Sequence, residues 1–165
     1  MRLALFAASA LAVCAQAAAQ TSELRAGQLL FGGVESDHAL IAACLRAEER
    51  SCENVVQDTC WADAEARHEE LTGVFARACD ERAIAAWEGE MNAALTALRG
   101  KLSGHDLDDL EASQRAWRRS VLADAQLAVD SFQGGTGAGR AADEVQAHAT
   151  ARRALFLMQL SESYP

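Results

Sequence analysis

The architecture follows from residues 84–132, which read IAAWEGEMNAALTALRGKLSGHDLDDLEASQRAWRRSVLADAQLAVDSF. Apolar side chains recur here at intervals of three and four residues, the spacing that gives a helix one apolar face. The two stripes are Ile84, Trp87, Met91, Leu95, Leu98 and Leu102, then, after Ser103-Gly104, Leu107, Leu110, Gln114, Trp117, Val121, Ala125, Ala128 and Phe132. Two long stripes joined by a short turn predict an antiparallel helical hairpin.

Shorter helical patterns flank this hairpin. Residues 38–50 and 52–70 predict two short helices, with Ser51 as a suitable N-cap between them, and Gly73 breaks or bends the pattern. A last helix is expected at about 141–161. Because no stretch alternates as a strand would, the predicted fold is all-α. We expect a small helical bundle built on the long hairpin, with short disulfide-linked helices at its N-terminal side.

The first nineteen residues have the pattern of an export signal. A positive start is followed by the apolar run Leu3–Val13 and by small residues before Ala19. This run is too short to span a membrane, which needs roughly 20 apolar residues. We expect a cleavable signal peptide cut near Ala19, and a periplasmic or secreted protein. Lipid attachment at Cys14 is not expected, because Val13 stands where a small residue is required.

Composition limits the classes of protein and partner. The 165 residues are 50% hydrophobic, which excludes a disordered chain. Basic residues number 15 and acidic residues 24, and removal of the signal with Arg2 changes the net charge from −9 to −10. This acidity argues against nucleic acid and against anionic membranes as partners. We expect a polar flexible lead-in at 20–37 and a single helical domain at 38–165.

The cysteines agree with export. Apart from Cys14 there are four, and an even number in an exported chain suggests two disulfides among Cys44, Cys52, Cys60 and Cys79. Four cysteines allow three pairings, of which we favour the sequential one, the first with the second and the third with the fourth. Their spacing does not fit a zinc site.

The sequence holds no catalytic motif. His68-Glu69-Glu70-Leu71 lacks the second histidine of a zinc-protease helix, and the glycine-rich run Gly134–Gly139 follows no strand and is better explained as a helix connection. We therefore expect no catalytic, cofactor or metal site, and no enzyme.

Several short elements in the second half of the chain occur in the order of a known family. They are Cys79 before a helix, Met91-Asn92, Gln114-Arg115-Ala116-Trp117, the loop Gly134-Gly135-Thr136, and Ala154–Leu157 in a final helix. With these elements, residues 79–160 resemble the N-terminal domain of the LprI-type lysozyme inhibitors. Residues 38–78 then look like a cysteine-containing extension.

The chain departs from the family pattern after its tryptophan. Val121-Leu122 stands in place of Arg-Asp, Asp124-Ala125 stands near an expected cysteine, and no cysteine follows the glycine loop. If the two family cysteines bridge each other, their joint loss is self-consistent. The last helix is then held by packing alone.

The resemblance implies a non-catalytic protein that blocks lysozyme or another basic cell-wall hydrolase. An acidic domain would attract such a partner over long range. The candidate contacts are the acidic residues at the hairpin turn, Asp106, Asp108, Asp109 and Glu111. The alternative is that these residues only cap and solvate the helix. An interaction module with an unrelated envelope partner, or a carrier of a small ligand in a core cavity, are the alternatives.

The motif residues are expected to be mainly structural. Trp117 should bury against Trp87 or Leu95, because it is the largest apolar group on its helix. The amide of Gln114 lies on the same face and must find partners, for which Asn92 on the facing helix is a candidate.

Overall fold

The computed structural model describes residues 34–47, 52–67, 72–133, 135 and 137–165. Every described helix belongs to one compact unit, residues 34–165. The predicted signal peptide, Ser51 and the His68 segment lie outside the described residues. So does most of the predicted lead-in.

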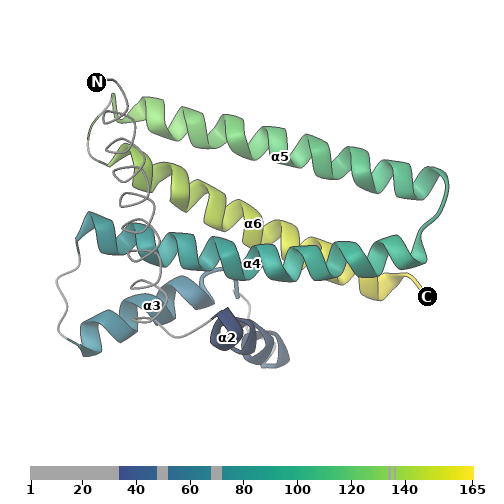
Figure 1. Cartoon of the computed structure of the whole chain (residues 1–165), viewed down its shortest axis with the longest axis horizontal. Coiled ribbons are helices and arrows are strands. Elements are labelled where there is room, and N and C mark those ends of the chain that lie inside the picture. The colour runs from purple at the N-terminus through teal and green to yellow at the C-terminus, as the bar shows by residue number, and fades with distance from the viewer. Residues whose placement is uncertain (1–33, 48–51, 68–71, 134, 136) are drawn as a thin grey trace, which may run out of the picture. The chain divides into compact units, whose positions relative to one another are not determined.

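The described residues form five helices and no strand, which confirms the all-α prediction (Figure 1). None of these helices combines the length and apolarity needed to cross a membrane. Their bounds are α2 Val34–Arg46, α3 Val55–Ala66, α4 Gly73–Lys101, α5 His105–Ser131 and α6 Ala138–Ser163.

The helices begin a few residues from the expected positions: α2 at Val34 rather than at 38, α3 at Val55 rather than at 52 and α6 at Ala138 rather than at 141. The starts of α4 and α5 also differ in how they are capped. Gly73 begins α4 rather than breaking it, because the side chain of Thr72 accepts a hydrogen bond from the Phe75 backbone N–H and caps the helix. Gly104, with a φ of 55°, is the residue that precedes α5. Asp106, one of the acidic residues that could cap the helix, lies in its first turn rather than at the N-cap, and a negative charge there suits the helix dipole.

The long hairpin is present, and α6 completes it. α4 and α5 run antiparallel from the short turn, and α6 lies between them over part of their length (Figure 1). Both pack extensively on α6 and little on each other. The buried face of α6 is rich in small residues, which lets its neighbours approach closely: Ala147, Thr150, Ala151 and Ala154.

The hydrophobic core is centred on α4, where Trp87 is the largest fully buried side chain. It packs in one cluster with apolar residues from α2, α5 and α6. Its indole Nε1 donates a hydrogen bond to the Glu53 carbonyl oxygen at 3.2 Å, so the residue also ties α4 to the chain just before α3.

Two disulfides hold the short helices. Cys44 pairs with Cys52, which joins α2 to the segment before α3, and Cys60 pairs with Cys79, which joins α3 to α4. This is the sequential pairing that we favoured. The covalent links therefore lie in the first half of the domain, and α5 and α6 are held by packing and polar contacts.

Polar contacts also fasten α2 to α4. Asp37, only 1% exposed, receives two hydrogen bonds from the guanidinium of Arg82. Beside it, His38 Nδ1 lies 2.7 Å from Glu90 Oε1. Gly89 leaves room for the His38 ring, because a Cβ at this position would lie 2.5 Å from a ring carbon. α2 begins at Val34, so Asp37 and its contacts belong to the folded helix rather than to a lead-in.

A buried carboxyl on α4 makes stability depend on pH. Asp80 is 4% exposed and accepts a hydrogen bond from Gln57 Nε2 at 2.8 Å, while its second oxygen has no partner among the described residues. Burial raises the pKa of Asp80 above its ordinary value, although the hydrogen bond from Gln57 and the nearby Arg140 oppose this. The folded protein therefore holds this proton more tightly than the unfolded chain does.

We expect Asp80→Asn to stabilise the protein near neutral pH. A raised folded-state pKa favours folding at low pH, and this contribution is lost as the pH rises through that pKa. The amide removes the titration and keeps an oxygen for Gln57. Thermal melts should show a higher Tm for the variant at about pH 7 and no advantage at about pH 3. A variant less stable than wild type at neutral pH would contradict this account.

Candidate functional site

The glutamine of the Gln-Arg-Ala-Trp motif links the three long helices. Gln114 on α5 is 3% exposed, and its Nε2 lies 3.4 Å from Met91 Sδ on α4. Its Oε1 accepts a hydrogen bond from Arg153 Nε on α6 at 3.0 Å. The expected partner Asn92 is exposed instead. One residue beyond Met91, it is rotated by about 100° around the helix axis and lies off the buried face of α4.

The tryptophan of the motif lies at the edge of the core. Trp117 was expected to be buried, but it is only half-buried and packs against the edge of the core cluster. The fully buried tryptophan is Trp87. The Arg153 guanidinium lies 6.0 Å from the centre of the Trp117 ring and 5.4 Å from that of Phe156. Partial burial lowers the pKa of Arg153. Arg115, between the two motif residues, points outward and is exposed.

We expect Trp117→Ala to lower stability by less than a core truncation, because only part of the ring is buried. A loss of about 1–2 kcal/mol corresponds to a drop in Tm of roughly 4–8 °C in a domain of this size. Differential scanning calorimetry of both proteins measures it, with Trp117→Phe as the control that keeps an aromatic ring. An unchanged Tm in the alanine variant would rule out the packing role.

The glycine loop before α6 is only partly described. Gly135 is exposed, while Gly134 and Thr136 lie outside the described residues. A Cβ on Gly137 would lie 2.6 Å from the ring of Phe132, so a side chain at this position would displace the ring from the start of α6.

The acidic candidates gather at the first turns of α5. Asp106, Asp108 and Asp109 are exposed, and Asp109 lies 3.5 Å from His105. Glu111 is engaged within the protein. Arg99 Nε donates a hydrogen bond to it at 2.8 Å, and that bond lowers the pKa of Glu111. The structure thus brings all four to one end of α5 and leaves three carboxylates open to solvent.

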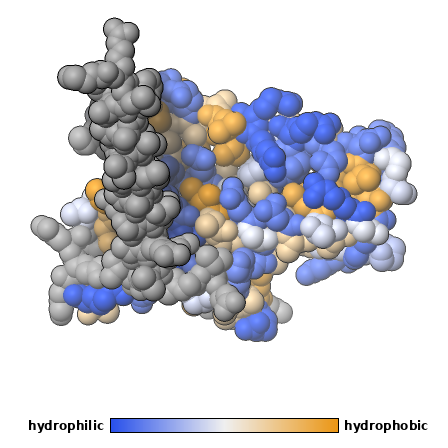
Figure 2. Space-filling model, viewed as in Figure 1, coloured by the Kyte–Doolittle hydropathy of each residue, from blue (hydrophilic) through white to orange (hydrophobic). Residues whose placement is uncertain are grey.

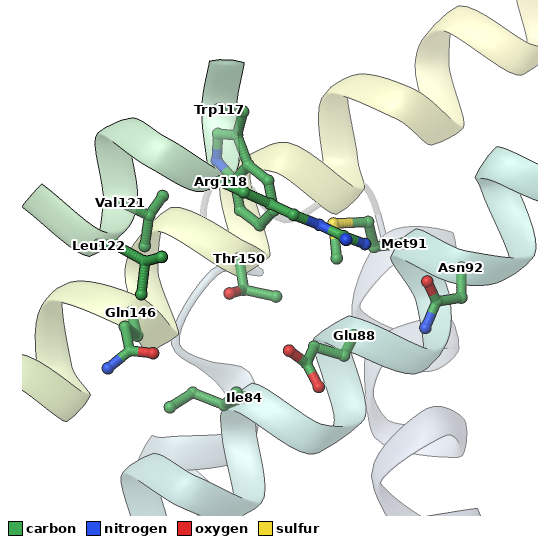
Figure 3. Close-up of a pocket in the computed structure, with 10 residues that line it drawn as sticks. All are labelled: Ile84, Glu88, Met91, Asn92, Trp117, Arg118, Val121, Leu122, Gln146 and Thr150. Carbon is green, nitrogen blue, oxygen red and sulfur yellow. The ribbon is translucent and has the colours of Figure 1, made fainter. Parts of the chain in front are cut away.

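A groove between α4 and α5, floored by α6, is the site that sequence reasoning missed. Its volume is about 370 Å³, and it exists because both helices lean on α6 rather than on each other. Figure 3 shows its walls and floor. The lining is Ile84, Glu88, Met91 and Asn92 from α4, Trp117, Arg118, Val121 and Leu122 from α5, and Gln146 and Thr150 from α6.

The surface around the long helices is mixed in character. Figure 2 shows hydrophobic residues in separate places among hydrophilic ones on the face in view. Leu122, at the rim of the groove, is 65% exposed, and Phe156 beside Arg153 is 51% exposed. In the described parts of the chain, no three histidine, cysteine or acidic side chains gather as they would around a metal ion.

These features define a small, disulfide-linked, all-helical domain with an exposed acidic helix end. Residues 60–157, more than half of the chain, match the family described as Lysozyme inhibitor LprI, and the chain belongs to this family. The match confirms the resemblance and begins earlier than expected, so it includes the Cys60–Cys79 disulfide. Comparison with curated proteins and with solved structures gave no match.

Proposed function

We propose that this protein is an exported, non-catalytic inhibitor that binds lysozyme or a similar basic cell-wall hydrolase. The observation that carries the proposal is the family match over residues 60–157. Two disulfides support a place outside the cytoplasm, because such bonds persist in oxidising compartments. Binding without chemistry also agrees with a sequence that has no catalytic motif.

The acidic first turns of α5 are the proposed contact surface. The chain without its signal has a net charge of −10, which follows from 14 basic and 24 acidic residues once Arg2 is removed. Asp106, Asp108 and Asp109 are the exposed carboxylates of this surface. They lie in the first turns of α5, next to the hairpin turn, where their charges attract a basic partner at long range.

A bacterial lysis assay tests both the activity and the surface. We expect wild type to slow lysis by lysozyme, and Asp106→Asn/Asp108→Asn/Asp109→Asn to need about tenfold more protein at low salt, because complementary charge speeds association. The control Asp58→Asn/Glu65→Gln/Asp124→Asn removes the same charge from exposed positions on α3 and in the later part of α5. Equal inhibition by both triple variants would reject this surface. Undiminished lysis with wild type would reject inhibition itself and favour an interaction module with another partner.

We also propose that residues 1–19 are removed on export. N-terminal sequencing of the exported protein should give a start at Gln20. A blocked N-terminus at Cys14 would show lipid anchoring instead.

A further inference from the structure

The groove between α4 and α5 has an apolar base. Met91 and Val121 are 3% and 9% exposed, and the half-buried Ile84 and Trp117 extend this surface toward the opening. Figure 3 shows these side chains around a common space. Binding of an apolar group to a surface of this kind is favourable, because the ligand displaces water from it.

Two opposite charges stand on facing walls of the groove. Glu88 projects from α4 and Arg118 from α5, and within the described residues neither forms a hydrogen bond or an ion pair (Figure 3). The other glutamate nearby on α4, Glu90, is engaged by His38. Both side chains are exposed to solvent, and both can pair with a charged ligand in the groove.

The floor offers a third unused polar group. Thr150 on α6 is 3% exposed and lies in the middle of the lining (Figure 3). Its hydroxyl makes no hydrogen bond within the described residues. This hydroxyl lines the groove and offers a ligand one further hydrogen-bonding group.

We propose that this groove binds a short peptide with free termini and an apolar side chain. The ammonium group pairs with Glu88, the carboxylate pairs with Arg118, and the side chain covers Met91 and Val121. A ligand with one charge would pair with only one of the two walls, and an uncharged apolar ligand would pair with neither.

The size of the groove sets the length of the peptide. Small-molecule sites occupy about 300–1,000 Å³, and the groove lies at the lower end of this range, which suits about two or three residues. The site is separate from the proposed lysozyme contact. On α5 its lining begins at Trp117, about three turns beyond the acidic first turn.

Isothermal titration calorimetry with leucyl-leucine tests the proposal on the disulfide-bonded protein without its signal. We expect measurable binding to wild type that weakens about tenfold when the peptide is N-acetylated or C-amidated. Glu88→Gln and Arg118→Gln should each cause a similar loss. The specific expectation is non-additivity: Glu88→Gln does not further weaken the acetylated peptide, and Arg118→Gln does not further weaken the amidated one.

Matched controls come from exposed charges outside the groove. Glu65→Gln on α3 and Arg119→Gln on α5 should bind leucyl-leucine as wild type does. Thermal melts confirm that every variant is folded. No binding of the free dipeptide at about millimolar concentration would overturn the proposal. So would blocked peptides that bind as well as the free one, or control variants that lose affinity as much as the groove variants.

Discussion

Replacement of Trp87 by alanine is expected to remove about 3–5 kcal/mol from the free energy of unfolding. The side chain is fully buried, and no other residue of its size has this position in the core. Its truncation opens a cavity among α2, α4 and α6 and leaves the Glu53 carbonyl without its indole donor. Since the total free energy of unfolding of a domain is only about 5–15 kcal/mol, this substitution removes a large part of the stability.

Chemical denaturation followed by circular dichroism measures this loss, and Trp61→Ala is the matched control. Trp61 is half-buried, packs edge-on against Phe75 at 5.8 Å and lies beneath Arg140. The same chemical change there should cost less than about 2 kcal/mol. Equal losses at the two positions would show that the core is not centred on Trp87.

Arg82→Met is expected to cost about 3–5 kcal/mol, because it leaves the Asp37 carboxylate buried without its partner. The side chain of Arg82 is itself only 12% exposed. The Asp37 carboxylate then either stays buried without a partner, or reaches water because α2 separates from α4. Denaturant unfolding gives the magnitude, and faster hydrogen exchange of α2 amides shows the detachment.

The double variant Asp37→Leu/Arg82→Met separates the penalty of an unpaired charge from the value of the pair. A buried pair replaced on both sides by apolar groups is often tolerated. We therefore expect the double variant to recover much of the stability that Arg82→Met loses. A double variant less stable than Arg82→Met would mean that packing around these side chains, rather than charge, holds α2.

The helices could be predicted from the sequence because each stripe is local. Residues 84–132 show the period of an amphipathic helix twice, with glycine at the turn, and α4 and α5 follow. The place of α6 between them could not be predicted. Its buried face depends on alanines such as Ala147 and Ala151, which give a weak periodic signal and act by letting neighbours come close.

The candidate site was harder to predict because its contacts are distant in sequence. Gln114 was correctly expected to need partners, but Arg153 lies 39 residues away on another helix, and no local pattern indicates it. Asp37 and Arg82 are 45 residues apart. The groove depends on the divergence of two helices, and its charges, Glu88 and Arg118, look like ordinary surface residues in the sequence.

The family match gives the domain its proposed role, and the structure supplies a rigid scaffold for it. Disulfides, the Asp37–Arg82 pair and the Gln114 contacts fix α2 to α6 around one core. An inhibitor that is already rigid loses little conformational entropy on binding, so most of its contacts contribute to affinity.

Direct binding to lysozyme tests the central claim most simply. The disulfide-bonded protein without residues 1–19 is titrated with a purified basic lysozyme by isothermal titration calorimetry at low and at physiological salt. The account predicts a saturable complex of defined stoichiometry, tighter at low salt and absent when the protein is first unfolded. No heat of binding at low salt, with the same lysozyme active on cells, would contradict the account.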